Sequence, residues 1–414
     1  MKRIDYILIF FVFLFDIFPN LNMFIPQWYD GLSNSLYFRS GIGALDIVLL
    51  FMLTLTIYRY VNKRYIYIKN NGIGGLFIVF FLWMLFEIIR NVGRYGLSAP
   101  GEFRFRYLIL VLPFYIALNF YTFESRKKLA KFLIIVSYFI PLLYIPVIGM
   151  MKGWVFGAEN RFLNSQIYLG MVYSLTLIWL CNKYKYLRFS KNILLISLFP
   201  FAFFFIIDSH RSVWLAAITM LGILFYINEL KVGKLIKVIP LILVISAVVF
   251  SIINKTGLNP TKYVEERGSA FVNPEADQTS YWRLIMWSLQ IEKFINSPII
   301  GEGFGGYWTV VLPDGQIVNV SPHSYYVQTL VKVGLIGMAL YLLIVFKLFS
   351  RLKQFLKIAK KKNNPEMPLI ILGFCVLITM HIYYIVYSLE YYSLFYIGLA
   401  AAVILDKRYY LNEE

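Results

Sequence analysis

One histidine, His323, stands where a polar stretch of the chain gives way to a new apolar segment. It is one of only 3 histidines in 414 residues. A neutral imidazole can take a proton from a hydroxyl group near neutral pH, which is the task of a general base. The alternative is an ordinary hydrogen-bonded histidine at a surface. His323 is the first candidate for a catalytic residue.

Arginine, rather than lysine, supplies most basic residues in one set of alternate loops. A guanidinium offers a planar fork that matches phosphate or carboxylate oxygens at two points, whereas a lysine offers a point charge. These loops therefore resemble an anion-recognition surface, with contact to anionic lipid headgroups as the alternative. The arginines concerned are Arg39, Arg90, Arg94, Arg104, Arg106, Arg161, Arg211, Arg267 and Arg283.

A second polar cluster, residues 208–214, forms a short hairpin between two apolar segments. Charged side chains at bilayer depth are costly unless they are partnered or functional. Asp208 and Arg211 are three residues apart and could pair with each other. Arg211 is thus either a structural ion-pair partner or a binding residue.

Three further ionisable residues lie inside apolar segments. His381 stands among aromatic residues and is best interpreted as a satisfied core histidine. Asp16 and Asp46 keep a proton-coupled transporter open as an alternative, because such residues form proton relays in transporters.

The elements that must position these residues are membrane helices. The chain is 59% hydrophobic, 19% aromatic and 15% charged, far from soluble averages. Apolar runs of spanning length recur from end to end, which predicts an all-α polytopic membrane protein. In that setting the net charge of +18 reflects anchoring at the cytoplasmic surface, and nucleic acid is not an expected partner.

We predict about twelve transmembrane helices and one large outer loop with surface helices. Residues 1–253 hold helices 1–9, residues 254–322 form the extracytoplasmic (periplasmic) loop, and residues 323–414 hold helices 10–12 and a cytoplasmic C-terminus. The predicted spans lie near 5–22, 40–59, 72–91, 105–122, 130–150, 164–182, 191–208, 212–228, 236–253, 324–346, 367–387 and 390–405.

Basic residues alternate in number from loop to loop along these spans. The rich loops, such as 59–69, 126–131 and 347–362, should face the cytoplasm. Both termini are then cytoplasmic. His323 and the arginine-rich loops face outward.

The outer loop should begin irregularly and contain a helix from Ser280 that ends at residues 296–298. Its apolar face would rest on the membrane surface while its polar face holds Arg283 toward an outer cavity. The glycine-rich run 301–306 would let the chain turn back to the membrane. Gly334 and Gly337 would permit close helix packing several turns after His323.

Four motifs occur in order: residues 209–216, 282–287, 297–307, and His323-Ser324-Tyr325 through Gly334-Leu335-Ile336-Gly337. Together they resemble the O-antigen ligase and O-antigen polymerase superfamily. The likeness covers roughly residues 195–345, and the earlier spans match only in number and layout. Where the ligase pattern often carries an acidic residue just before the first glycine, this chain has Lys332 and Val333.

The resemblance implies a GT-C-like, metal-independent, inverting glycosyltransferase without cofactor. It would move a glycan from undecaprenyl diphosphate to an acceptor hydroxyl on the outer side of the bacterial cytoplasmic (inner) membrane. The family's loop histidine falls on His323, its loop arginine on Arg283 and its hairpin arginine on Arg211. Arg104, Arg106 and Arg161 join Arg211 and Arg283 as candidate diphosphate ligands.

Chemistry agrees with that set. Cations can stabilise a diphosphate leaving group, and a base can activate a sugar hydroxyl, so no metal is required. The expected partners are the lipid-linked donor, a lipid or glycan acceptor, and membrane lipids. A ligase is favoured over a repeat-unit polymerase, and a lipid-linked glycan flippase is the alternative of another class. Sugar, linkage, acceptor, envelope type and oligomeric state stay open.

Overall fold

The computed structural model describes residues 3–22, 44–62, 72–96, 108–143, 165–190, 210–231, 278–305, 309–311, 317–319 and 322–406. The single positions 99, 150, 233, 244, 247 and 251 are described as well. Two predicted spans lie outside the described residues. These are 191–208 and, apart from positions 244, 247 and 251, 236–253.

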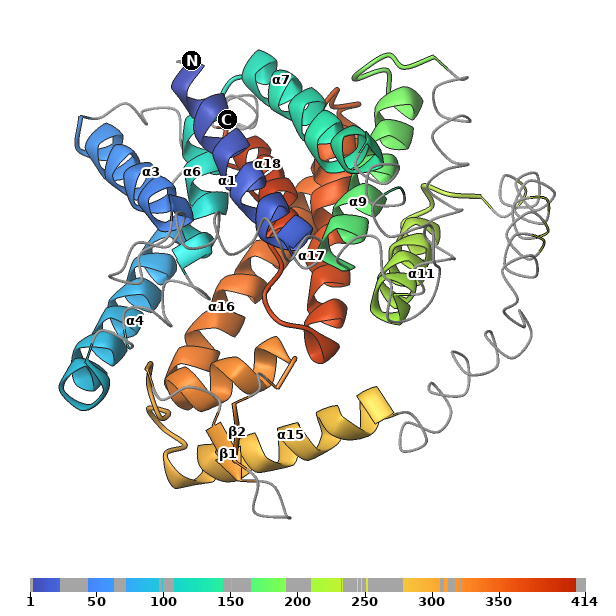
Figure 1. The fold of residues 1–414 in the computed structure, drawn as a ribbon. Coiled ribbons are helices and arrows are strands. Elements are labelled where there is room, and N and C mark those ends of the chain that lie inside the picture. The colour runs from blue at the N-terminus through green and yellow to red at the C-terminus, as the bar shows by residue number, and fades with distance from the viewer. Residues whose placement is uncertain are drawn as a thin grey trace.

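The described elements are almost all helices (Figure 1). In chain order they are α1 (Arg3–Asn22), α3 (Ala44–Val61), α4 (Ile73–Tyr95), the 3-10 helix η1 (Leu108–Leu110), α6 (Val111–Asn119), α7 (Phe123–Ile134), the π-helix η2 (Ile135–Phe139), α9 (Ser165–Lys183), α11 (Arg211–Tyr226), α15 (Gln278–Asn296), β1 (Thr309–Val311), β2 (Ile317–Asn319), α16 (Tyr325–Lys361), α17 (Met367–Val386) and α18 (Tyr392–Ile404).

Three of the described helices, α4, α16 and α17, are long and apolar enough to cross a membrane. Helix α4 also turns large apolar side chains outward, with Leu82 59% and Ile89 66% exposed. Such faces suit lipid rather than water, which supports a membrane protein. The count of twelve spans and the loop's position outside the membrane stay predictions.

Helices α17 and α18 form the centre of the bundle. Helix α18 packs against α6 and α17, while α17 also packs against α16, α11 and α9. Fully buried tyrosines, including Tyr173, Tyr383 and Tyr384, fill the space between them. The core therefore combines apolar surface with many hydroxyl groups, which need hydrogen-bond partners when buried.

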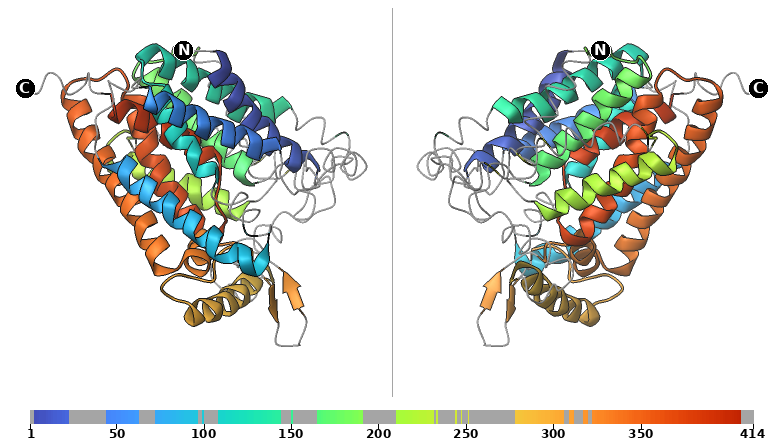
Figure 2. Two further views of the ribbon diagram at one scale, coloured as in Figure 1. Left: turned by 90° about the vertical axis from the view of Figure 1, so that its left-hand side faces the viewer. Right: turned by 90° about the vertical axis from the view of Figure 1, so that its right-hand side faces the viewer.

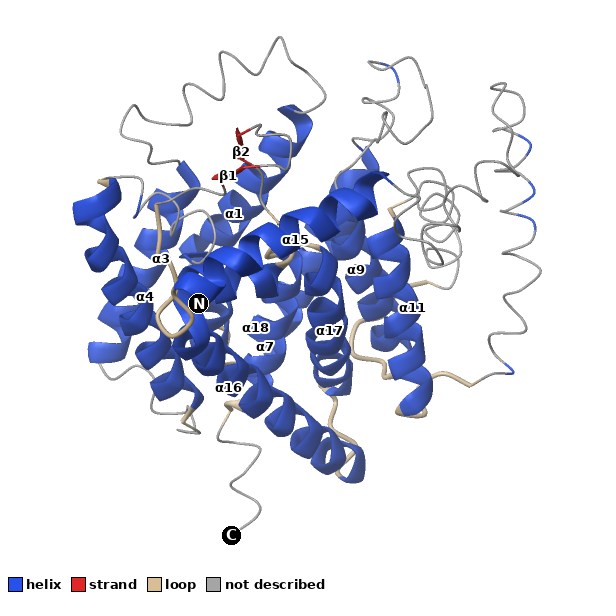
Figure 3. Cartoon of the chain, turned by 90° about the horizontal axis from the view of Figure 1, so that it is seen from below, coloured by secondary structure: helices blue, strands red, loops and turns tan. Residues whose placement is uncertain are grey.

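Helix α15 lies across one end of this bundle rather than within it (Figures 2 and 3). It ends at Asn296, as the sequence predicts. Beside it, β1 and β2 pair as a short antiparallel hairpin, with Thr309 opposite Asn319. This is the one strand pair among the described residues, and the fold is otherwise helical as predicted; its strands Thr309–Val311 and Ile317–Asn319 are rich in β-branched residues, which favour strand pairing.

Both ends of the described chain lie at the end of the bundle opposite α15, which we call the termini end (Figures 1 and 2). Near the N-terminus, Arg59 of α3 donates to Asp5 of α1 at 2.8 Å. Near the C-terminus, Arg126 of α7 bonds to Asp406 just after α18, at 3.1 Å. The termini thus share one side of the bundle; that this side is cytoplasmic stays a prediction.

Arg126 corrects a prediction. It was expected to anchor a surface loop, and its helix to begin near residue 130. Thr122 instead caps α7 from Phe123, and Arg126 is fully buried with two hydrogen bonds to Glu366. Because the cap at Thr122 starts the helix earlier, Arg126 lies within α7 and inside the bundle. A buried guanidinium there needs carboxylate partners.

Helix α16 is not continuous. Gly334 has φ 64° and ψ −169°, so the helix consists of a short half before it and a long half after it. The sequence predicts that Gly334 and Gly337 serve helix packing. Gly337 does face Trp83, but Gly334 breaks the helix in a conformation that is nearly exclusive to glycine.

Candidate functional site

His323 lies at the entrance to the short half of α16. Its side chain is exposed, and its backbone takes a positive φ of 49°. The next residue, Ser324, caps α16 by accepting from the amide of Val327. The capped start fixes the helix direction and leaves the imidazole at the bundle surface.

Tyr387, directly after α17, brings two predicted site residues together. Its ring centroid lies 6.2 Å from that of His323, and the Arg283 guanidinium lies over the same ring at 5.8 Å. The amide of Tyr325 donates to the Tyr387 carbonyl at 2.9 Å, which ties this residue to α16. We call His323, Arg283 and Tyr387 the Tyr387 cluster.

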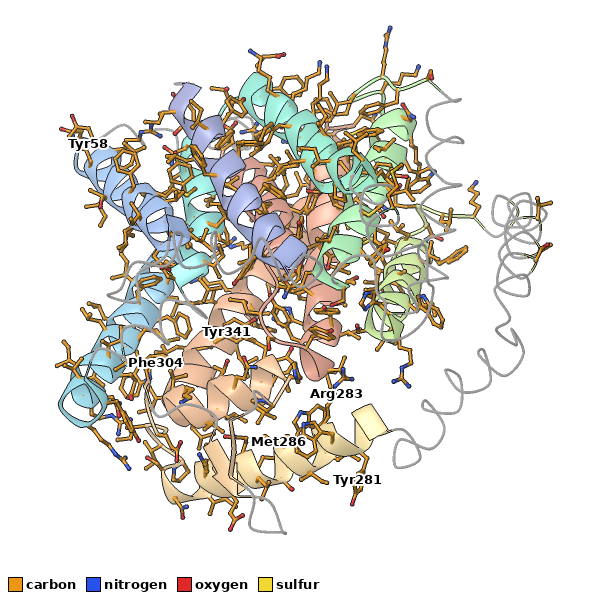
Figure 4. The ribbon with its side chains drawn as sticks, viewed as in Figure 1. Tyr58, Tyr281, Arg283, Met286, Phe304 and Tyr341 are labelled. Atoms are coloured by element: carbon orange, nitrogen blue, oxygen red, sulfur yellow. The ribbon has the colours of Figure 1, made fainter. Side chains whose placement is uncertain are left out.

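Arg283 reaches this cluster from α15. In Figure 4 it points toward the bundle, whereas Tyr281 points away. One turn further on, the indole of Trp287 donates to the carbonyl of Pro322 at 2.6 Å. This bond joins α15 to the residue before His323. Arg283 on α15 and His323 are therefore held near each other by a direct contact between their segments.

Arg211 is the first residue of α11 and shares this end of the bundle. The preceding His210 is buried against Tyr168 of α9, with ring centroids 5.5 Å apart. At the start of the same helix α9, Ser165 shares a hydrogen bond of 2.9 Å with Tyr383, which stacks on Tyr387. Packing of α9, α11 and α17 thus brings Arg211 to the end that holds the Tyr387 cluster, which we call the His323 end.

Three candidate diphosphate ligands, Arg104, Arg106 and Arg161, lie outside the described residues, as does Asp208. Two other arginines of the predicted outer set are seen. Arg90 bonds to Glu87 and to the Gly301 carbonyl, so its role is structural. Arg94 is exposed and lies over its neighbour Tyr95 at 4.9 Å.

The segment 298–303 repairs the break in α16. Carbonyls of Pro298 and Ile299 accept from the amides of Leu335 and Ile336, at 2.9 and 3.2 Å. Conversely, the amides of residues 302 and 303 donate to the carbonyls of residues 331 and 332. A Cβ on Gly301 would stand 2.5 Å from the Gly334 nitrogen. The glycine-rich run is therefore structural: it orients the half-helix that follows His323.

Sequence reasoning missed Tyr387. Its signal was the density of tyrosines at the end of α17, where Tyr383, Tyr384 and Tyr387 recur at helical spacing. The sequence does indicate the role of His381 correctly. Its ring nitrogens lie 2.7 Å from the Leu377 carbonyl and 3.2 Å from the Tyr341 hydroxyl. It is a satisfied, mostly buried histidine.

No group of three or more His, Cys, Asp or Glu side chains suited to a metal ion occurs among the described residues. Cys181 and Cys375 are buried and free. The side chains gathered at the His323 end are instead an imidazole, guanidinium groups and tyrosines. They can move a proton and bind anions.

Comparison with known proteins gives the same segment. Residues 195–342 match the family model described as O-Antigen ligase. A Rickettsia typhi protein named "Putative polysaccharide ligase" is 26% identical over 140 residues, which are 30% of this chain and 32% of that protein. The chain thus covers about a third of this relative's length. Arg211, Arg283 and His323 all fall inside the segment that is similar to the O-antigen ligase family.

Proposed function

We propose that this protein is a ligase-type glycosyltransferase. It moves a glycan from undecaprenyl diphosphate to an acceptor hydroxyl on the outer side of the bacterial cytoplasmic membrane. The observation that carries the proposal is the meeting of His323 and Arg283 at Tyr387. Both residues come from the segment that is similar to O-antigen ligases.

His323 acts as general base. A sugar hydroxyl is a poor nucleophile until its proton is removed, and a positioned base contributes about 10²–10⁴-fold to the rate. The exposed imidazole can reach an acceptor from solvent or from the lipid surface. Attack in line with the departing diphosphate inverts the anomeric carbon.

Arg283 and Arg211 bind the leaving group. Charge grows on the diphosphate as the glycosidic bond breaks, and guanidinium forks stabilise that charge in the transition state. Tyr387 holds Arg283 by contact between its ring and the cation. The reaction then proceeds without a metal ion. Arg104, Arg106 and Arg161 are further candidate ligands of the same diphosphate.

The test is transfer in proteoliposomes with an undecaprenyl-diphosphate glycan as donor. His323→Ala, Arg283→Ala and Arg211→Ala should each lower turnover strongly. Arg188→Ala is the matched control, since Arg188 is an exposed arginine shortly after α9 and lies outside the candidate anion-binding set. Wild-type turnover by the His323 variant would remove the general-base assignment, and retention of the anomeric configuration would remove direct displacement.

The same assay separates the two related activities. A product that moves to a new acceptor supports a ligase, whereas a donor glycan that lengthens supports a repeat-unit polymerase. Passage of labelled donor across the membrane without any new glycosidic bond would support a flippase instead.

A further inference from the structure

Gln290 of α15 is fully buried, yet neither polar atom of its side-chain amide has a hydrogen-bond partner within the described structure. An amide without partners is costly in the folded protein. Gln328 in the first half of α16 shows the usual solution, because its amide donates to Ser388 at 2.8 Å. Gln290 is therefore out of place unless something else binds it.

Its position points to the proposed active site. Gln290 follows Arg283 by seven residues, which is two helical turns and about 10.5 Å along α15. Both side chains therefore share the helix face that is turned to the bundle, together with buried Met286. Positions further round the helix are open, with Leu284 43% and Ile291 44% exposed.

The anchors of α15 stand on both sides of Gln290. Before it, Trp287 is bonded to Pro322. After it, the segment 298–303 is bonded to the break in α16. Gln290 lies between the His323 turn and the repaired helix break, where a ligand that enters between α15 and α16 would meet it.

The amide selects the ligand's chemistry. It offers donors and an acceptor, so it is satisfied by a group that both donates and accepts. A sugar hydroxyl does so, whereas a diphosphate oxygen only accepts. We propose that Gln290 binds a hydroxyl of the donor's glycan when α15 shifts away from α16 to admit it, while Arg283 binds the diphosphate. This inference rests on the proposed function and adds a residue that positions the sugar.

Gln290→Leu tests it in two ways. Without ligand, the variant should melt at a higher temperature than wild type, because leucine removes an unpartnered polar group from a buried site. With donor, KM should rise roughly three- to tenfold, as expected for one lost hydrogen bond. The matched control, Gln328→Leu, breaks an existing bond to Ser388 and should lower the melting temperature.

Two ligands separate sugar from phosphate. Undecaprenyl-diphosphate glycan and sugar-free undecaprenyl diphosphate should both raise the melting temperature of the wild type. Gln290→Leu should weaken the effect of the glycan-carrying lipid only, whereas Arg283→Ala should weaken both. Equal loss for both lipids, or none for either, would overturn the assignment of Gln290.

The experiments distinguish failure of the transferase proposal from failure of the Gln290 assignment. If neither lipid stabilises the wild type and no transfer occurs, the transferase proposal fails and the Gln290 assignment fails with it. If wild-type transfer proceeds while Gln290→Leu keeps the wild-type KM, only the Gln290 assignment fails.

Discussion

The two ends of the bundle use the same kinds of side chain for different purposes. At the termini end, Arg126 is fully buried and its fork bonds to both Glu366 oxygens, at 2.7 and 2.6 Å. At the His323 end, Arg283 lies over the ring of Tyr387. One arginine is enclosed by carboxylates that neutralise it, and the other is presented on an aromatic support beside an exposed histidine.

Among the described residues, the termini end contains three such matched clusters, of which Arg126 with Glu366 and Asp406 is the first. Asp5 accepts from Arg59 and from the hydroxyl of Tyr115. Glu229, in the turn after α11, pairs with Lys183 and Lys360. Each cluster joins helices that are distant in sequence. Matched charges there fix the fold, whereas the polar groups at the His323 end include the unmatched amide of Gln290.

The largest expected effect is on the matched end. Arg126→Met leaves Glu366 and Asp406 buried without their cation, which should cost about 3–5 kcal/mol of stability. Thermal unfolding in detergent measures it, and transfer per folded molecule should stay close to wild type. Lys128→Met, at an exposed position two residues on, should shift stability by less than about 0.5 kcal/mol. Equal stability of the two variants would refute a structural role for the Arg126 cluster.

The second expected effect is at the helix break. Gly334→Ala forces a side chain into a glycine-only conformation and against the Ile299 carbonyl, which should cost at least about 1–3 kcal/mol. Turnover should fall as well, because the half-helix behind His323 moves. Gly222→Ala is the control: Gly222 lies inside α11 with nothing within 4 Å of the added Cβ, and alanine there should be neutral or stabilising. Normal turnover by Gly334→Ala would show that His323 does not depend on the break.

A smaller effect concerns pH at the termini end. Burial alone would raise the pKa of the Glu229 carboxyl, but hydrogen bonds from Lys183, Tyr184 and Lys360 hold it below its usual value. A depressed carboxyl pKa stabilises the fold above the unfolded-state pKa, and this stabilisation is lost as pH falls through the folded pKa. Melting temperature should therefore decline in acid, and Glu229→Gln should flatten that decline. An unchanged pH profile in Glu229→Gln would contradict this assignment.

What the sequence predicts at each end of the bundle depends on whether a feature is set by local sequence or by contacts between distant residues. Apolar runs predict most of the described helices, because burial or lipid contact of a whole segment is a local property. The end of α15 at Asn296 is predicted by another local signal, the helix-stopping sequence at residues 296–298. The ion pair between Arg126 and Glu366 cannot be predicted from local sequence, because the two residues are 240 positions apart.

The candidate site likewise contains residues that local motifs predict and one residue that only the packing of helices brings there. Motif order identifies His323, Arg283 and Arg211, all within residues 195–342. Tyr387 lies beyond that segment and joins the site only through helix packing. The helix break at Gly334 cannot be predicted from the sequence either. A glycine in an apolar segment has the same sequence surroundings whether it allows helix packing or interrupts the helix.

The smallest expected effect tests the link between α15 and His323. Trp287→Phe replaces the indole by a smaller aromatic ring and removes the hydrogen bond to Pro322, worth about 0.5–1.5 kcal/mol. If that bond holds Arg283 and His323 in register, turnover should drop roughly two- to tenfold with little change in melting temperature. Tyr281→Phe on the exposed face of the same helix should leave both unchanged. Loss of melting temperature without loss of turnover would instead make Trp287 a structural residue, and the His323 end would then resemble the termini end in using its contacts to stabilise the fold.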